Sequence, residues 1–137
     1  MKKYLISLMC MMSMTVFAQD TPPVQVAATM IQNPNAKFQL FSTQNIYVFL
    51  KLNTATGEIY IVQYGFDRNE RVEVKLDSEV YPLVQPEEEQ AGRFFLYPTT
   101  NIYNFILLDQ IDGRLWQVQW DTKPDNRIIF KIGKAGN

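Results

Sequence analysis

The sequence predicts an all-β, antiparallel protein in which two similar four-stranded meanders form one sandwich-like or barrel-like domain. The first observation is an internal repeat, because residues 37–76 and 93–132 align without a gap at a shift of 56 residues, with 13 identities in 40 positions. The second is the alternation of apolar and polar residues in short runs, which is typical of half-buried strands. The third is the glycine, proline and asparagine between these runs, where turns are expected.

The amino-terminal segment, residues 1–18, is predicted to be a signal peptide. Two lysines precede an apolar stretch that ends at the small-residue site Val16-Phe17-Ala18. Lipid attachment at Cys10 is disfavoured, because it would leave apolar residues directly after the anchor. We therefore expect export to the periplasm or the cell exterior, with no membrane span after cleavage.

Removal of residues 1–18 leaves 119 residues that contain neither cysteine nor histidine. This composition excludes intrachain disulfides, thiolate nucleophiles, Ser-His-Asp catalysis and zinc sites built from nitrogen and sulfur ligands. The remaining 11 basic and 14 acidic residues give a net charge of −3, which disfavours generic nucleic-acid binding. We expect a non-enzymatic protein without cofactor or metal, stabilised by packing.

Residues 19–36 are predicted to form an amino-terminal arm, and residues 133–137 a tail. Residues 77–92 have the composition of a linker, with prolines and an acidic run. The alternation within the repeats predicts strands at 37–42, 46–53, 58–65 and 71–76 in repeat 1, and at 93–97, 102–109, 114–121 and 127–132 in repeat 2. We expect a rough twofold axis to relate the two meanders.

Turns are predicted where the same residue types recur in both repeats. Asn53 and Gly57 of repeat 1 correspond to Asp109 and Gly113 of repeat 2. The Asx side chain can accept a hydrogen bond from a loop amide, and glycine can adopt a positive φ. The second and third strands of each repeat are therefore expected to form a hairpin.

An aromatic stripe along the third strand of each repeat is predicted to form the core. It consists of Tyr60, Val62 and Tyr64 in repeat 1 and of Trp116, Val118 and Trp120 in repeat 2. A tryptophan that buries about 200 Å2 contributes on the order of 5 kcal/mol before entropy is counted. Few other residues could stabilise a chain without cysteine as much.

Both repeats follow the pattern Arg/Lys-Phe-x-Leu-x-x-Thr-x-Asn-Ile-Tyr-x-Phe, then Gly-x-x-Tyr/Trp-x-Val-Gln-Tyr/Trp. This pattern resembles a group of uncharacterised small secreted bacterial proteins that carry the unit in tandem. The resemblance covers residues 37–132 and implies export and an all-β fold, and it brings over no site residue. A second likeness, carried by Leu108-Asp109 through Gly113 to Trp116, is to propeller blades, of which two could close a ring only as a homo-oligomer.

The candidate ligand-binding residues are aromatic and amide side chains from both repeats. Aromatic faces can stack on sugar rings and amides can bind hydroxyls, but a period-two aromatic stripe is more often core, and polar residues at a bend usually bind the backbone. The candidates are Trp116, Trp120, Tyr60, Tyr64, Gln63, Gln119, Asn45 and Asn101. No residue is predicted to be catalytic or to bind metal.

Two arginines at equivalent positions, Arg71 and Arg127, are expected to pair with carboxylates or to shield a strand edge. The function that we expect is that of a secreted, non-catalytic binding or interaction module for a protein or a glycan. One alternative is a lectin-like protein, which would need an exposed Trp116 or Trp120. The other is a small periplasmic or secreted enzyme inhibitor that presents a loop such as residues 53–57.

Overall fold

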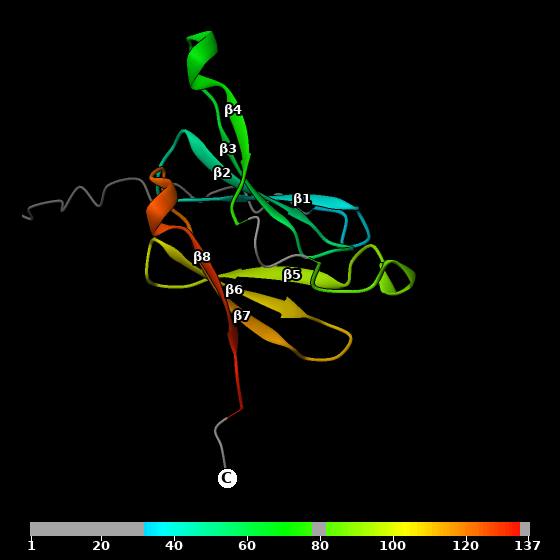
Figure 1. Cartoon of the computed structure of the whole chain (residues 1–137). Coiled ribbons are helices and arrows are strands. Elements are labelled where there is room, and N and C mark those ends of the chain that lie inside the picture. The colour runs from blue at the N-terminus through cyan, green and yellow to red at the C-terminus, as the bar shows by residue number, and fades with distance from the viewer. Residues whose placement is uncertain (1–31, 78–81, 135–137) are drawn as a thin grey trace, which may run out of the picture. The chain divides into compact units, whose positions relative to one another are not determined.

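The computed structural model describes residues 32–77 and 82–134, which form two antiparallel sheets of four strands (Figure 1). The first sheet contains β1 (Phe38–Ser42), β2 (Val48–Asn53), β3 (Ile59–Gln63) and β4 (Val72–Lys75). The second contains β5 (Phe94–Pro98), β6 (Asn104–Asp109), β7 (Leu115–Gln119) and β8 (Ile128–Ile132). Three 3-10 turns, η1 (Arg68–Glu70), η2 (Pro86–Glu88) and η3 (Pro124–Asn126), lie between described strands. The predicted fold class is confirmed, and the predicted signal peptide lies outside the described residues.

The strand pairing is the same in both sheets at the shift of 56 residues. Phe38 pairs with Asn53 in the first ladder, and Phe94 pairs with Asp109 in its counterpart. The same correspondence holds for every pair of the β2–β3 and β3–β4 ladders and their equivalents in the second sheet. Both copies of the repeat therefore adopt the same backbone arrangement.

The second strand of each repeat begins two residues later than predicted, because Asn45 and Asn101 form Asx turns. The Asn45 Oδ1 atom accepts a hydrogen bond of 3.0 Å from the Tyr47 amide, and the Val48 amide donates to the Asn45 carbonyl at 3.0 Å. Asn101 accepts an equivalent bond of 3.0 Å from the Tyr103 amide. These bonds hold residues 45–47 and 101–103 in a turn and out of the ladder.

Each sheet has two faces, and the pairing register assigns every strand residue to one of them. Face A of repeat 1 comprises Gln39, Phe41, Val48, Leu50, Leu52, Ile59, Ile61, Gln63, Val72 and Val74, and in repeat 2 it comprises Phe95, Tyr97, Asn104, Ile106, Leu108, Leu115, Gln117, Gln119, Ile128, Phe130 and Ile132. Face B comprises Phe38, Leu40, Ser42, Phe49, Lys51, Asn53, Tyr60, Val62, Glu73 and Lys75 in repeat 1, and Phe94, Leu96, Pro98, Phe105, Leu107, Asp109, Trp116, Val118, Ile129 and Lys131 in repeat 2.

The hydrophobic core is built from unlike faces of the two repeats. Face A of repeat 1 contributes Val48, Leu50, Leu52, Ile59 and Ile61, and face B of repeat 2 contributes Phe94, Leu96, Phe105, Leu107, Trp116, Val118 and Ile129. A twofold axis would bring the same face of both repeats to the core, so the predicted twofold relationship is wrong. The aromatic stripe of repeat 1, Tyr60, Val62 and Tyr64, is correspondingly not part of the core, whereas its counterpart in repeat 2 is buried.

The connection between the repeats also contributes to the core. Leu83 and Val84, within the predicted linker, are buried in the same cluster as the strands. Thr54, in the β2–β3 hairpin, is fully buried, and its carbonyl accepts a hydrogen bond of 2.8 Å from the Phe94 amide. The Gly92 amide donates to the Thr54 hydroxyl at 2.9 Å. The hairpin of repeat 1 is thus bonded directly to the start of β5.

Candidate functional site

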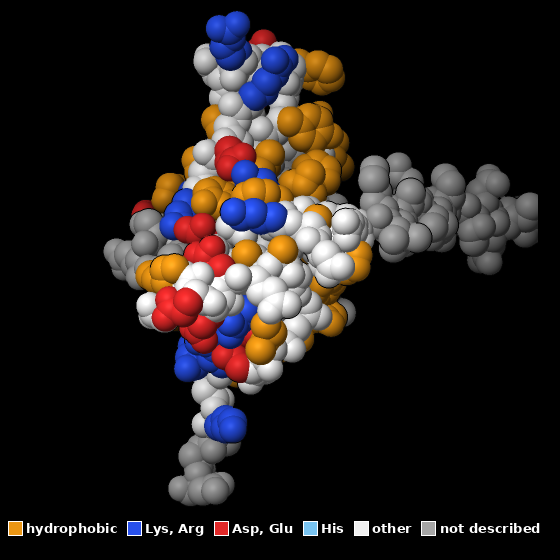
Figure 2. Space-filling model, turned by 90° about the vertical axis from the view of Figure 1, so that its right-hand side faces the viewer, with side chains coloured by type: hydrophobic (Ala, Val, Ile, Leu, Met, Phe, Trp, Pro, Cys, Tyr) orange, Lys and Arg blue, Asp and Glu red, His pale blue; other side chains and the backbone are white. Residues whose placement is uncertain are grey.

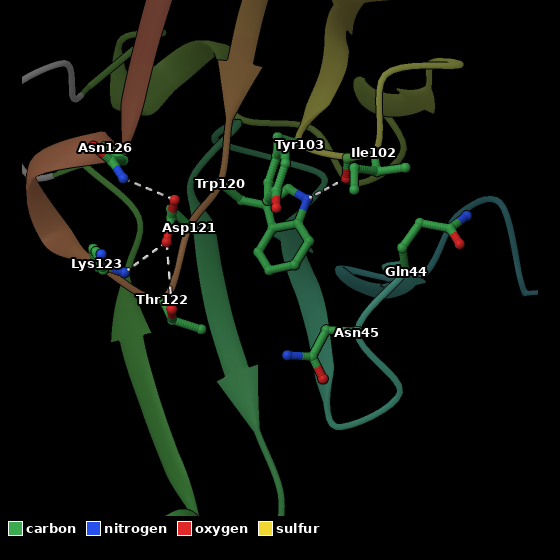
Figure 3. Close-up of a pocket in the computed structure, with 9 residues that line it drawn as sticks. All are labelled: Gln44, Asn45, Ile102, Tyr103, Trp120, Asp121, Thr122, Lys123 and Asn126. Carbon is green, nitrogen blue, oxygen red and sulfur yellow. Dashed lines mark hydrogen bonds between the residues drawn. The ribbon is translucent and has the colours of Figure 1, made fainter.

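A cavity of about 560 Å3 lies where the β1–β2 and β5–β6 turns meet the chain after β7 (Figure 3). Its lining consists of Gln44, Asn45, Ile102, Tyr103, Trp120, Asp121, Thr122, Lys123 and Asn126. A smaller cavity of about 160 Å3 shares Gln44 and Ile102 with it and reaches Thr99, Asn101 and Asn104. Amide, carboxylate, hydroxyl and ammonium groups surround the larger space, so it offers both donors and acceptors to a polar molecule.

Trp120, which directly follows β7, forms one wall of the larger cavity and is only 4% exposed. Its indole Nε1 donates a hydrogen bond of 3.0 Å to the Ile102 carbonyl, and its ring centroid lies 5.9 Å from that of Tyr103 (Figure 3). Burial and the satisfied indole nitrogen leave no open ring face for stacking on a sugar. Trp120 therefore fixes the β5–β6 turn against β7.

Asp121 forms the polar wall of the same cavity. The Lys123 amide and the Asn126 side chain each donate to its carboxylate at 2.9 Å, and these bonds lower the pKa of Asp121 (Figure 3). Figure 3 shows Asn45 on the opposite side, below the Trp120 ring. An ionised carboxylate and an amide thus face one space from two different repeats.

The eight predicted binding residues do not form one site. Asn45 and Trp120 line the larger cavity and Asn101 lines the smaller one. Trp116 is 3% exposed in the core, where its ring centroid lies 6.1 Å from that of Phe94. The remaining four lie away from these cavities, and they are Tyr60, Tyr64, Gln63 and Gln119.

Two of these four, Tyr60 and Tyr64, belong to an outward aromatic surface on repeat 1. Tyr60 is half-buried, and the Lys51 ammonium lies 4.7 Å from the centroid of its ring. Tyr64 is 51% exposed and packs against Tyr47 at a centroid distance of 5.7 Å. The glutamines lie on face A, where the Gln119 amide donates to the Asn126 carbonyl at 2.8 Å.

Arg71 and Arg127 bind backbone carbonyls, and within residues 32–77 and 82–134 neither forms an ion pair with a carboxylate. Arg71 donates to the Gly65 carbonyl at 2.9 Å and to the Phe66 carbonyl at 2.8 Å. Arg127 donates to the carbonyls of Asp121 and Thr122, both at 2.8 Å. Each arginine therefore holds the turn that precedes its own strand, and this use explains why the residue occurs in both repeats.

A buried ionic cluster in repeat 2 was not predicted from the sequence. The carboxylate of Asp109, with no exposed surface, lies 2.9 Å from Arg93 and 3.1 Å from Arg114. Burial favours the neutral acid, but hydrogen bonds from Arg93, from the amides of Ile111 and Asp112 and from Arg114 outweigh it and lower the pKa of Asp109. The hydrogen bond with Asp109 in turn raises the pKa of Arg93. Both groups are therefore charged, and the cluster joins the start of β5 to the β6–β7 hairpin.

Comparisons of the chain with protein-family models, with curated proteins and with solved structures return no match. Among residues 32–77 and 82–134, no three side chains of the metal-binding types come together in a cluster. The same residues contain no helix that is long and apolar enough to cross a membrane.

The loop suggested for an inhibitor, residues 53–57, is buried. Asn53, Thr54 and Ala55 have little or no exposed surface. A β-carbon at Gly57 would lie 2.7 Å from the Leu83 side chain and 3.1 Å from that of Phe94. This loop is therefore covered by the chain itself and is not presented to a partner.

Large apolar side chains are exposed on the two sheet faces that the sandwich leaves outward. Face B of repeat 1 exposes Phe38 and Leu40, and Tyr64, the residue directly after β3, is exposed beside Tyr47 and Phe49. Face A of repeat 2 exposes Tyr97, Phe130 and Ile132. Figure 2 shows further hydrophobic side chains along the β3–β4 hairpin, which projects at the top of the view. An antiparallel sheet normally turns polar side chains to water, so these faces are suited to contact another molecule.

Proposed function

We propose that the protein is an exported, non-catalytic interaction module that binds a macromolecular partner through its outward sheet faces. The observation that carries the proposal is the row of apolar and aromatic side chains on face B of repeat 1. Leu40, within β1, is 49% exposed, and Tyr64, directly after β3, is 51% exposed, although both side chains are large. Exposed apolar surface of this kind marks sites of interaction.

The composition of this face is that of a protein interface. Aromatic residues are enriched at the centre of interfaces, whereas lysines and glutamates are depleted there. Lys51 forms an ion pair with Glu73 and lies 5.3 Å from the centroid of the Phe38 ring. The charges on face B are therefore paired before a partner arrives, which lowers the cost of covering them.

Site-specific photo-crosslinking in cells that express the protein tests the proposal. Tyr64→p-benzoylphenylalanine places the probe beside face B, where the Tyr64 ring lies 6.1 Å from that of Phe49, and Ile111→p-benzoylphenylalanine places it at an exposed loop residue of the β6–β7 hairpin. We expect a discrete crosslinked species from position 64 that is absent from position 111 and is lost when Leu40→Glu is added. Equal adducts from both positions, or none from position 64, would contradict the proposal.

A second candidate function is the binding of a polar small molecule, such as a glycan, by the polar groups of the cavity at the turns and not by stacking on tryptophan, because Trp116 and Trp120 are buried. The specific observation is the space of about 560 Å3 bounded by Asn45, Asp121 and Lys123. A ligand there would lie beside Trp120, so saturating binding should change tryptophan fluorescence. A glycan panel should therefore produce a signal in the native protein that Asn45→Leu abolishes, and an unchanged spectrum across the panel would exclude this use of the cavity.

A further inference from the structure

We infer that the partner of the outward faces is a second copy of this chain, whose face A of repeat 2 covers face B of repeat 1. The inference rests on the proposed function, because it names the partner for the same surface. Its source is the core of the molecule, in which a face A and a face B already pack together.

The internal interface is of the heterologous kind. Face A of repeat 1 contributes residues such as Leu50 and Ile59, and face B of repeat 2 contributes residues such as Leu107 and Val118. The two surfaces that meet are different, so each repeat still has its other face available. One chain therefore ends in a free face B on repeat 1 and a free face A on repeat 2, the same two kinds of surface that pack inside it.

The free face A keeps the apolar character of its buried counterpart. Ile106, Leu108 and Leu115 occupy the positions that correspond to the fully buried Leu50, Leu52 and Ile59. No Asp, Glu, Lys or Arg stands at any face A position of the described strands β5–β8. A sheet face intended for water would carry such charges. The Phe95 ring of this face also contacts the Phe41 ring of repeat 1, at a centroid distance of 5.6 Å.

The free face B likewise keeps the residues that its counterpart buries. Phe38 and Leu40 correspond to Phe94 and Leu96, which have almost no exposed surface. Tyr60 stands where Trp116 is buried, at the same point of the ladder. Apart from Lys51 and Glu73, the core positions on face B of repeat 2 are thus repeated with similar side chains on the outside of repeat 1.

Two pairs of polar residues on the free faces are already bonded within their own sheet. On face B, Lys51 and Glu73 take the positions of Leu107 and Ile129 and form an ion pair. On face A, the Gln117 amide donates a hydrogen bond of 2.9 Å to the Asn104 side chain. Covering them leaves these bonds intact, and the cost of burying a polar group falls when its partner is already bound.

Heterologous contacts between copies close into a ring when the rotation per copy divides a full turn, and otherwise build a filament. In either assembly every copy uses both faces, one toward each neighbour. A contact through one kind of face alone would instead be symmetric and would stop at a dimer. Substitutions on either face should block a heterologous assembly. A symmetric dimer should be blocked only by substitutions on the one face that it uses.

Analytical ultracentrifugation of the full-length protein tests the inference. Leu40→Glu places a charge on face B and Phe130→Glu places one on face A, so each should prevent contact through that face. Both residues are exposed enough that the fold should be retained. We expect the native protein to associate with rising concentration and each variant alone to be monomeric. Mixing the two variants should yield a dimer with one copy of each, because each supplies the face that the other lacks.

Ile111→Glu, at an exposed loop residue, should associate as the native protein does, and circular dichroism should show the same β-sheet content in all variants. A native protein that stays monomeric at every concentration would overturn the inference, as would a variant that dimerises alone or a mixture that remains monomeric. A protein that does not self-associate would contradict this inference without contradicting the proposed function. A monomeric protein that still gives a crosslinked species from position 64, with a mass other than twice that of the chain, would retain an interaction role with a different partner.

Discussion

Arg93 and Asp109 form a buried ion pair in which the guanidinium Nε lies 3.0 Å and 2.9 Å from the two carboxylate oxygens. The equivalent residues of repeat 1 are Lys37 and Asn53, so the pair exists in one repeat only. The β6–β7 hairpin and the start of β5 are therefore joined by a charge interaction that the β2–β3 hairpin lacks.

Asp109→Ala is expected to destabilise the fold by about 3–5 kcal/mol, because it leaves the buried Arg93 without its main partner. Urea unfolding followed by tryptophan fluorescence measures the change. Asp125→Ala removes an exposed carboxylate as a control and should change the free energy of unfolding by no more than about 0.5 kcal/mol. Equal effects of the two substitutions would show that the ion pair contributes nothing to stability.

The stability of the protein should fall in acid through Asp109. Its folded pKa is lowered, so its contribution is complete above the unfolded pKa of about 3.9 and is lost as the pH falls through the folded value. Asp109→Asn has no such group. The difference in unfolding free energy between the native protein and this variant should therefore be constant near neutral pH and shrink below about pH 4. A difference that grows on acidification would contradict the assignment.

Two leucines at equivalent positions should respond differently to the same truncation. Leu96 is fully buried, and Leu96→Ala should cost about 2–5 kcal/mol. Leu40, its counterpart in repeat 1, lies on the outward face, and Leu40→Ala should change the stability of the dilute protein by about 0.5 kcal/mol or less. Thermal unfolding of both variants makes the comparison. Similar losses would mean that both repeats bury face B.

The hairpin glycines provide a second matched pair. Gly57 and Gly113 have φ values of 80° and 76°, so alanine at either position should cost about 1–2 kcal/mol of backbone strain. Gly57→Ala should cost more, because its β-carbon would also meet Leu83 at 2.7 Å, whereas nothing lies within 4 Å of one at Gly113. Chemical denaturation of the two variants gives the difference, which would vanish if the hairpins were packed alike.

The sequence was sufficient to predict the strands and their pairing because these depend on local features. The Asx turn at Asn45 and the positive φ of Gly57 recur at Asn101 and Gly113, and they set the same register twice. The delayed start of β2 was not predicted because Ile46 and Tyr47 continue the apolar pattern although they lie in the turn.

The buried face was not predicted from the sequence because both faces of each sheet carry large apolar side chains. Val62 and Val118 are identical residues at equivalent positions, yet one is half-buried and the other has no exposed surface. Their different burial depends on whether the other sheet packs over them. This is a property of the tertiary fold and not of the local sequence. The Arg93–Asp109 pair was missed for a related reason, since the aspartate alone already explained a turn.

The larger cavity illustrates how far residue types alone predict a site. Asn45 and Trp120 were both candidates, and both lie in its wall, but Asp121, Lys123 and Asn126 were not predicted. Those three lie together because Arg127 and Asp121 shape the chain after β7 into a compact turn. That turn has no counterpart of the same composition in repeat 1, so comparison of the repeats gave no signal for it.

Because a face A packs on a face B, the two ends of the domain differ. Repeat 1 leaves face B outward, and repeat 2 leaves face A outward. A symmetric pair is complete once formed, whereas a directional pair presents at each end the surface that the next unit requires. A gene that gained a third tandem unit would therefore need no new kind of contact to accommodate it. The packing geometry therefore sets no limit on the number of tandem repeats in one chain. That number depends on the gene.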